Sequence, residues 1–290
     1  MLVLGFDDYE LPGRRLAQAL SLPFEKIELH QFPDGESKLR LPPELPERVI
    51  ICRSLDDPNS KLIELLLSAQ TAREQGARHL TLVAPYLCYM RQDMAFHPGE
   101  AVSQRIIGRF LADLFDRVIT TDAHLHRISH LSEAIPGIRA VNTTAASIMS
   151  DFLKGQNTGL LLVGPDSESA QWVEAIAGEA GYDCVVAQKK RLGDQQVKIT
   201  LPAGNYADKK IVLIDDVIST GHTLITVAAL LYGQGVASID TLVTHALYDD
   251  STARHLRKTG IGHIWSTDSI PHASNTLHLD QLLADAVREG

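Results

Sequence analysis

Two adjacent carboxylates and a short run of hydroxyl and glycine residues form the stretch of the sequence best suited to chemistry. The stretch is KIVLIDDVISTGHT, from Lys210 to Thr223. Its chemistry-bearing residues are Asp215, Asp216, Ser219, Thr220, Gly221, His222 and Thr223. Carboxylates accept hydrogen bonds from sugar hydroxyls, and the backbone N–H groups of a small-residue loop before a helix bind phosphate. The stretch therefore predicts a sugar-phosphate site with adjacent acids.

The flanking residues predict where this site lies in a fold. Ile211–Ile214 is a continuous apolar run, which is typical of a strand buried on both faces of a parallel sheet. An apolar-periodic helix follows at Thr223–Tyr232. In open α/β sheets, ligands bind at the carboxyl ends of the strands. The alternative is an ordinary strand-to-helix turn, in which Asp and Ser are present only for turn geometry.

Other residues that could bind a ligand or take part in catalysis follow predicted strands in the first half of the chain. FPDGE, which spans Phe32–Glu36, is a hairpin turn on local grounds, because Pro-Asp-Gly is turn chemistry. Arg91 offers a permanently charged fork to polyphosphate oxygens, and Gln92 can bind a base or ribose edge. His124 ends a strand and could be a metal ligand or a phosphate contact, although a lone histidine is more often structural.

Two further groups occur in the second half. Asp166 ends a buried strand, and its carboxylate could bind Mg²⁺ or a ribose hydroxyl. Gln188–Arg191 follows another strand and carries adjacent basic residues. A Lys/Arg cluster is more often a solvated surface than a binding site, and by itself this group leaves both interpretations open.

The elements that must position these residues alternate between strand and helix, which predicts an α/β fold with a mostly parallel sheet flanked by helices. Expected strands are Leu2–Gly5, Lys26–Leu29, Arg48–Cys52, Leu80–Ala84, Arg117–Thr121, Gly159–Val163, Asp183–Ala187, Ile211–Ile214, Ile239–His245 and His263–Trp265. Expected helices are Lys61–Glu74, Ala101–Phe115, Glu168–Ala180, Thr223–Tyr232, Ser251–Lys258 and Asp280–Arg288.

The 290 residues suit two domains, and a faint internal duplication supports that division. RVITTDAH at Arg117–His124 parallels KIVLIDDVISTGHT, and HLTLVAPYL at His79–Leu87 parallels GLLLVGPDS at Gly159–Ser167. The Asn142-Thr143-Thr144 run has the composition of a helix cap. We therefore expect domains at residues 1–143 and 144–290.

Composition excludes several classes of protein. The hydrophobic fraction of 44% and charged fraction of 22% are typical of a soluble globular protein, and no apolar run approaches the length of a membrane span. A net charge of −9 argues against a nucleic-acid surface. MLVLGFDDYE lacks a basic region and fits a first strand better than a signal peptide, so a cytoplasmic location is expected.

Taken together, these motifs resemble the PRPP synthetases, or ribose-phosphate pyrophosphokinases, which make 5-phosphoribosyl 1-pyrophosphate (PRPP). The central stretch also resembles the PRPP-binding motif of type I phosphoribosyltransferases. FPDGE, the YxxYxRQD pattern that ends at Asp93, and the Asp-x-His of residues 122–124 are similar to the synthetases specifically. The Pro-Asp at Asp166 and the Lys-x-Arg of residues 189–191 also match. The resemblance runs from Phe32 to about Asp268.

The resemblance implies two tandem phosphoribosyltransferase-like domains, the first with most of the ATP site and the second with the ribose 5-phosphate site. It implies a transferase of nucleotide biosynthesis, a ribose-phosphate diphosphokinase. Such an enzyme moves the β,γ-pyrophosphoryl group of Mg-ATP to the C1 hydroxyl of ribose 5-phosphate and yields PRPP and AMP. The implied cofactor is Mg²⁺. A homo-oligomer is also implied, as a dimer or a multiple of dimers.

The resemblance also implies the roles of individual residues. The ATP pocket would comprise Phe32, Asp34, Glu36, Arg91 and Gln92. The ribose 5-phosphate site would comprise Asp215, Asp216, Ser219, Thr220, Gly221, His222 and Thr223. His124 and Asp166 would hold Mg²⁺ directly or through water. Lys189 and Arg191 would clamp the transferring group, with His124 as the remaining catalytic residue.

Departures from the family pattern keep two alternatives open. The family usually has a Gln-rich helix where this chain has residues 125–130, and Glu168 and His222 are also unusual. A non-catalytic regulatory homologue could tolerate these changes, although retention of Lys189 and Arg191 argues against it. A PRPP-consuming phosphoribosyltransferase would share the central motif, but that alternative does not account for FPDGE or for the duplicated domain.

Overall fold

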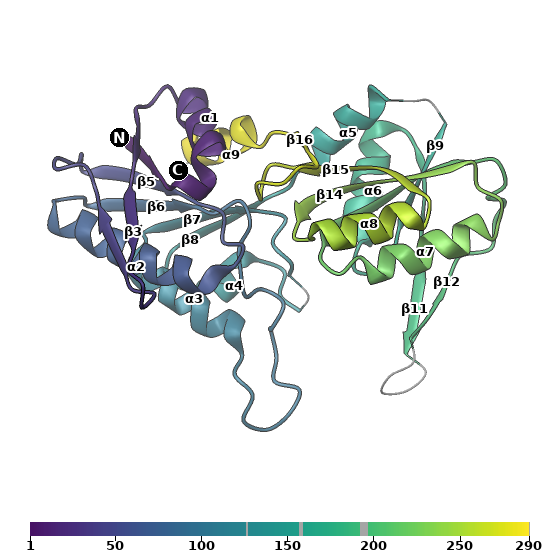
Figure 1. The fold of residues 1–290 in the computed structure, drawn as a ribbon, viewed down its shortest axis with the longest axis horizontal. Coiled ribbons are helices and arrows are strands. Elements are labelled where there is room, and N and C mark those ends of the chain that lie inside the picture. Colours follow the sequence, from purple (N-terminus) through teal and green to yellow (C-terminus); the bar gives the residue numbers. More distant parts are fainter. Residues whose placement is uncertain (126, 157–158, 192–196, 290) are drawn as a thin grey trace. The chain divides into compact units, whose positions relative to one another are not determined.

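The computed structural model describes residues 1–125, 127–156, 159–191 and 197–289, and the side chains of residues 189–191 and 197–198 lie outside that description. The described residues divide into two compact units (Figure 1). The first comprises Met1–Thr144, Ser269–Pro271 and His278–Gly290. The second comprises Ala145–Asp268 and His272–Leu277. Each unit is built on a parallel sheet with helices on both faces, as the sequence predicts.

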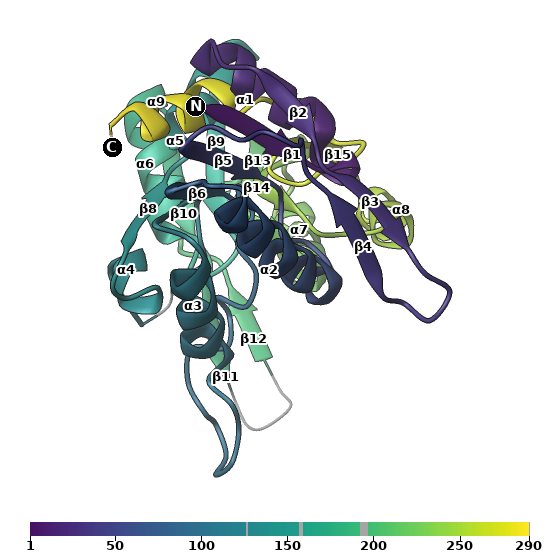
Figure 2. The ribbon, with the colours of Figure 1, turned by 90° about the vertical axis from the view of Figure 1, so that its left-hand side faces the viewer.

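The first unit has apolar parallel strands buried between two helical layers. Its sheet runs β2 (Phe24–Lys26), β1 (Leu2–Gly5), β5 (Arg48–Cys52), β6 (His79–Val83), β7 (Arg117–Thr121) and β8 (Arg139–Thr143). The short 3₁₀ helix η1 (Asp7–Tyr9) leads into α1 (Glu10–Leu20), which lies on one face with α9 (Asp280–Arg288). The other face is covered by α2 (Pro58–Glu74), α3 (Ser103–Leu114) and α4 (Leu131–Ala134) (Figure 2). This arrangement exposes only the strand ends and loops to ligands.

The second unit repeats the same plan. Its sheet runs β10 (Asp183–Val186), β9 (Leu160–Gly164), β13 (Lys210–Ile218), β14 (Ser238–Ala246), β15 (Ile261–Thr267) and β16 (Asn275–Leu277). One face is covered by α5 (Ala146–Lys154) and α6 (Ala170–Ala180), the other by α7 (His222–Tyr232) and α8 (Asp250–Lys258). Because the first half of β13 is buried on both faces, residues 211–214 form a continuous apolar run in the sequence.

Both units also carry an antiparallel hairpin between the second and third strands of their sheets. The first has β3 (Glu28–Gln31) with β4 (Ser37–Arg40), and the second has β11 (Gln188–Arg191) with β12 (Val197–Thr200). The shared strand order confirms the predicted tandem repeat. The paired stretches predicted from the sequence are not equivalent, however. Sheet position matches β7 with β15 and β5 with β13, because each pair has the same rank in its sheet.

The C-terminal helix differs from the expected division at residues 143 and 144. The first unit does end its main segment at Thr144, but α9 belongs to it as well. In the second unit α5 packs on α6, and in the first unit α9 packs on α1 in the same way. Buried Arg117 fixes α9 by donating hydrogen bonds from Nη1 to Val287 O and from Nη2 to Ala286 O. The last helix therefore fills a place that no earlier helix occupies.

Most predicted elements are present, with bounds that shift by a few residues. The predicted strand Lys26–Leu29 is wrong, because buried Ile27 forms a corner between β2, which pairs with β1, and β3, which pairs with β4. The predicted helix Ala101–Phe115 is shorter at both ends. Within the described residues, no helix has the length and apolar character needed to cross a membrane.

Candidate functional site

The paired acids of the second unit lie on β13 itself, beyond the end of the neighbouring strand. The ladder between β13 and β9 stops at the Leu213–Val163 pair. Pro165 follows β9 and has no N–H with which to extend the ladder. β13 continues to Ile218 by pairing with β14. The predicted end of this strand at Ile214 is therefore wrong, and Asp215 and Asp216 project from an edge that β9 leaves uncovered.

Like charges gather at this strand end. Successive residues of a strand point to opposite faces, and here Asp216 is 3% exposed whereas Asp215 is partly exposed. Burial raises the pKa of Asp215 well above its ordinary value, and the carboxylates of Asp216 and Asp166 raise it further. Asp215 is therefore harder to ionise than an ordinary aspartate, and a bound cation or hydrogen-bond donor would favour its charged form.

Asp166 is held by its own loop between β9 and α6. Buried Ser169 donates from Oγ to Asp166 O at 2.6 Å, and Glu168 donates from its backbone N to Asp166 Oδ1 at 3.1 Å. Gly164 is required here, because a Cβ on it would lie 2.5 Å from Ser169 Oγ. The unusual Glu168 thus supports Asp166 through its backbone. Sequence reasoning missed Ser169, although a serine directly before an apolar helix is a recognisable signal.

The loop after β13 forms a small concave site at the start of α7. A cavity of about 120 Å³ is lined by Asp215 and residues 217–224. Gly221 has φ +69°, and a Cβ on it would lie 3.1 Å from atoms of Leu256 and Thr252. His222 follows as the first residue of α7, with an exposed side chain. The first-turn N–H groups of a helix lack intrahelical partners, so this loop can bind an anion.

In the first unit, the FPDGE residues form the tip of the β3–β4 hairpin, as predicted from turn chemistry. Phe32 N donates to Glu36 O at 2.8 Å, and Gly35, with φ +93°, donates from N to Phe32 O at 2.9 Å. Asp34 accepts from Glu36 N at 3.2 Å. Phe32 is 40% exposed, which is unusual for a large apolar residue. The tip thus presents an aromatic face and two carboxylates to solvent.

Arg91 and Gln92 lie in the loop after β6. Arg91 is exposed and makes no ion pair with the described residues, and Gln92 donates from Nε2 to Met94 O at 3.3 Å. Buried Gln104 of α3 ties this loop down: its backbone N donates to Gln92 O and its Nε2 to Met90 O, each at 3.1 Å. The loop backbone is fixed while the Arg91 guanidinium is available to a ligand.

His124 lies in the adjacent loop after β7 and is partly buried. The preceding Asp122 adopts φ +42°, a conformation that costs a non-glycine residue about 1–2 kcal/mol. Asn142 stabilises this bend by accepting a hydrogen bond at Oδ1 from Ala123 N at 2.9 Å. The sequence predicted Asn142 as part of a helix cap. It lies instead on β8, and its supporting role depends on strand neighbours that a sequence does not reveal.

The predicted residues thus fall into groups within each unit. Asp166, Asp215, Asp216 and the loop of residues 219–223 meet at the carboxyl edge of the second sheet. Arg91, Gln92 and His124 follow the neighbouring strands β6 and β7 of the first. Lys189 and Arg191 lie on β11, but their side chains are outside the described set. Over the described residues, no three His, Cys, Asp or Glu side chains have the arrangement of a metal site.

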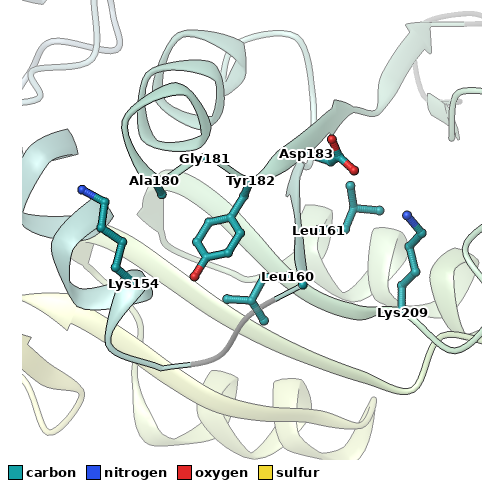
Figure 3. Close-up of a pocket in the computed structure, with 9 residues that line it drawn as sticks. Lys154, Leu160, Leu161, Ala180, Gly181, Tyr182, Asp183 and Lys209 are labelled. Carbon is teal, nitrogen blue, oxygen red and sulfur yellow. The ribbon is translucent and has the colours of Figure 1, made fainter.

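A larger pocket lies at the opposite edge of the second sheet (Figure 3). Its volume is about 570 Å³, and Leu160, Asp183 and Lys209 mark it as the edge where β9, β10 and β13 begin. Figure 3 shows Tyr182 between Lys154 and Lys209, and Tyr182 donates from its hydroxyl to Leu153 O at 3.0 Å. None of the predicted site residues lines this pocket. Pocket size in this unit therefore does not point to the edge that carries the predicted site residues.

Comparison with known proteins accounts for both units. Residues 2–114 match the N-terminal domain of ribose phosphate pyrophosphokinase, and residues 129–279 match the phosphoribosyl transferase domain. A ribose-phosphate pyrophosphokinase of Methanopyrus kandleri is 32% identical over 99% of this chain and 98% of its own length. The chain belongs to the ribose-phosphate pyrophosphokinase family. A ribose-phosphate pyrophosphokinase of Methanosarcina acetivorans is also 32% identical, over 99% of both chains.

A solved structure shares the fold of this chain over nearly its whole length. The crystal structure of phosphoribosylpyrophosphate synthetase from Mycobacterium smegmatis matches with a TM-score of 0.84. The match covers 99% of this chain and 97% of the other at 20% identity. The family and fold expected from the motifs are therefore confirmed.

Proposed function

We propose that this chain is a ribose-phosphate diphosphokinase, which transfers the β,γ-pyrophosphoryl group of Mg-ATP to the C1 hydroxyl of ribose 5-phosphate. The products are PRPP and AMP. In this reaction the hydroxyl oxygen bonds to the β-phosphorus, and the bond from that phosphorus to the α,β-bridging oxygen breaks. Family membership over both units carries the proposal, because a phosphoribosyltransferase would not account for the match of residues 2–114.

The second unit supplies the ribose 5-phosphate site of this proposal. The N–H groups of residues 219–223, at the start of α7, bind the 5-phosphate, and the helix dipole favours its negative charge. Asp215 and Asp216 accept hydrogen bonds from the ribose hydroxyls. The small cavity is consistent with this assignment, since both Asp215 and the loop line it. Orienting the C1 hydroxyl in this way contributes to catalysis by fixing the direction of attack.

The first unit supplies most of the ATP site. Phe32 stacks on the adenine base, and its exposure at a hairpin tip supports that role. Asp34 and Glu36 flank it and accept hydrogen bonds from the nucleotide. Arg91 binds phosphate oxygens through its planar fork, and Gln92 binds the base or ribose edge. These assignments follow the family pattern at matching positions of this sequence.

Mg²⁺ fits the carboxylates of the second unit. Magnesium prefers oxygen ligands and is often held by one or two carboxylates together with substrate phosphates. Burial raises the pKa of Asp215, and the neighbouring carboxylates of Asp216 and Asp166 raise it further, so a divalent cation would relieve the repulsion among these acids. In the proposal Asp166 holds Mg²⁺, and His124 of the first unit holds Mg²⁺ through water or directly. The ion would neutralise the charge of the polyphosphate.

Lys189 and Arg191 complete the proposal as the clamp on the transferring pyrophosphoryl group. Pyrophosphoryl transfer requires placement and charge neutralisation more than covalent participation by the protein. A cation that meets the developing charge lowers the barrier more than it strengthens substrate binding. The hairpin β11–β12 that carries both residues has its counterpart in the β3–β4 hairpin of the first unit.

We also propose that the enzyme is a homo-oligomer and that it is cytoplasmic.

The direct test is a phosphorus NMR time course of the protein with Mg-ATP and ribose 5-phosphate. Sugar-dependent AMP and a new C1-pyrophosphate resonance are expected, and a sample without sugar should give neither. No PRPP and no AMP over a range of pH and phosphate concentration would rule out the enzymatic function. If titration still showed ATP binding, the regulatory homologue would then be the better description.

A second test isolates the clamp. Lys189→Ala should lower kcat by about 10²–10³-fold, the usual cost of removing one stabilising donor, with little change in the KM values. Lys190→Ala is the matched control, because it removes the same charge from the next position of β11. An equal loss in ATP affinity for Lys189→Ala would contradict the clamp and favour a ground-state binding role.

A further inference from the structure

An ion pair with a buried carboxylate joins the two loops of the first unit that carry the predicted nucleotide residues. Asp93 follows Arg91 and Gln92 in the loop after β6. Arg127 lies three residues beyond His124 in the segment after β7. Arg127 Nη1 is 2.6 Å from Asp93 Oδ1, which is the distance of a strong charge-assisted hydrogen bond.

The burial of this pair is unequal. The side chain of Asp93 is 2% exposed, whereas that of Arg127 is 50% exposed. Asp93 Oδ2 is also buried and has no hydrogen-bond partner among the described residues. A buried carboxylate without a partner is costly, so this loop conformation depends on the one guanidinium that reaches it. The conformation of the Asp93 loop thus depends on Arg127, which lies at the surface.

Two ties therefore bracket Arg91 and Gln92. On one side, Gln104 of α3 bonds the carbonyls of Met90 and Gln92. On the other, Arg127 bonds the carboxylate of Asp93. Beyond Asp93 the chain runs into an extended loop before α3 (Figure 2), which offers no regular structure to hold the end of the Arg91 segment. The second tie thus comes from the β7 side of the unit.

We propose that Arg127 is a positioning residue for nucleotide binding. Through its ion pair with Asp93, it fixes the position of the Arg91–Gln92 loop relative to the His124 loop. This inference rests on the proposed ATP site and adds a role for two residues outside it. Arg127 acts through the Asp93 carboxylate and does not need to touch the nucleotide. Loss of either partner should release the same loop, so the two substitutions should weaken ATP binding to a similar extent and their effects should not add.

The experiment compares Arg127→Met, Asp93→Asn and the double variant in the full-length protein. Each single change should raise the Kd for Mg-ATP, measured by calorimetry, and the KM for ATP by about tenfold, which corresponds to about 1.4 kcal/mol. The KM for ribose 5-phosphate should stay within about twofold, since that site lies on other elements. The double variant should be no weaker than either single variant. Arg127→Lys should recover part of the affinity because it restores the charge.

Arg109→Met is the matched control, because Arg109 is an exposed arginine of α3 with no ion pair among the described residues. It should leave the Kd for ATP unchanged. A lower Tm without a change in Kd in the pair variants would show a structural role and overturn the proposal. A weaker Kd in Arg127→Met but not in Asp93→Asn would also overturn it, since Arg127 would then contact ATP directly.

The double variant keeps the test decisive if a single variant fails to fold, since it leaves no unpaired buried charge. Calorimetry separates this inference from the proposed function. An inactive wild type that still binds ATP would refute the diphosphokinase while the Kd values still decide the role of Arg127. A wild type that binds no ATP would overturn the positioning role as well.

Discussion

The ends of β5 and β13 have the same place in their sheets but opposite electrostatics. After β5, buried Arg53 pairs with Asp8 at 3.1 Å and with Glu64 at 2.6 Å, and Lys61 pairs with Asp8 at 3.1 Å. At the end of β13, burial raises the pKa of Asp215, and the carboxylates of Asp216 and Asp166 raise it further. The first unit brings its own cations to its acids. The second places acids beside one another.

This difference shows how one repeated fold can serve two purposes. In the first unit the charges are neutralised internally, and the network also reaches the β3–β4 hairpin, because Ser37 Oγ donates to Glu64 Oε1 at 2.9 Å. The same strand end thus supports a hairpin rather than a ligand. In the second unit, desolvated like charges carry a cost that a bound cation or ligand repays. The comparison predicts unequal responses to mutation.

The largest expected effect is on the network of the first unit. Arg53→Met leaves buried Glu64 without its cation, while Asp8 keeps Lys61. Breaking a buried pair in this way costs about 3–5 kcal/mol of unfolding free energy. Urea denaturation measures the loss. Arg78→Met, which removes an exposed pair with Glu47, is the control and should leave the midpoint nearly unchanged. A loss below about 1 kcal/mol for Arg53→Met would contradict internal neutralisation as a stabilising device.

A smaller loss is expected at the loop of the second unit. Gly221→Ala forces a Cβ into a left-handed conformation, which costs about 1–2 kcal/mol, and against Leu256. Affinity for ribose 5-phosphate should fall with stability, because the loop must shift. Gly181→Ala shares the positive φ but meets nothing within 4 Å. This control should lose similar stability without losing affinity, and an affinity loss in both would remove the link to the loop.

Asp215→Asn should stabilise the ligand-free protein. A folded-state pKa above the ordinary value means that the folded chain binds more protons, so stability falls as pH rises from about 4 towards the raised pKa. Asparagine cannot ionise, so the variant should not lose this stability as pH rises. Each kcal/mol gained in unfolding free energy raises Tm by roughly 2–4 °C. Calorimetry at several pH values tests this, with exposed Asp151→Asn as the control. A variant that loses stability at neutral pH would contradict the comparison.

The smallest effect is expected for His222→Gly. His222 occupies the first helical position of α7 with ordinary helical geometry, while Gly221 takes the left-handed conformation. Glycine at position 222 should therefore change ribose 5-phosphate affinity by less than about threefold, or roughly 0.6 kcal/mol. Calorimetric titration gives the value. A tenfold gain in affinity would mean that the histidine obstructs the loop after all.

The sequence was sufficient for elements whose burial is uniform. Arg117–Thr121 and Arg48–Cys52 were predicted with their observed bounds, because strands buried on both faces are continuous apolar runs. Helix α1 was missed, since Pro12 and Gly13 indicate a turn. Pro12 is tolerated in the first helical turn, and Gly13 is needed because a Cβ would lie 3.0 Å from the ring of Phe24. Phe24 lies on β2, outside the helix, so the local sequence around Gly13 does not reveal this requirement.

Site residues were predictable where a motif is contiguous, and supporting residues were not. Asp215 and Gly221 belong to one short stretch, so spacing alone indicated them. Asn142 and Arg127 support neighbouring loops from other segments, and their partners are set by strand order. The ion network around Arg53 was invisible for the same reason, because Asp8, Arg53 and Glu64 meet only after the sheet has formed.

The place of α9 has a consequence for biosynthesis. The first unit lacks one of its covering helices until the ribosome has translated the whole second half, about 10–30 s later at ordinary elongation rates. During that interval α1 and the β7–β8 face await their partner. The second unit is also completed late, because its edge strand β16 is translated only just before α9. Vectorial synthesis would therefore complete both units only at the end of translation, although the first unit waits longer for its last element.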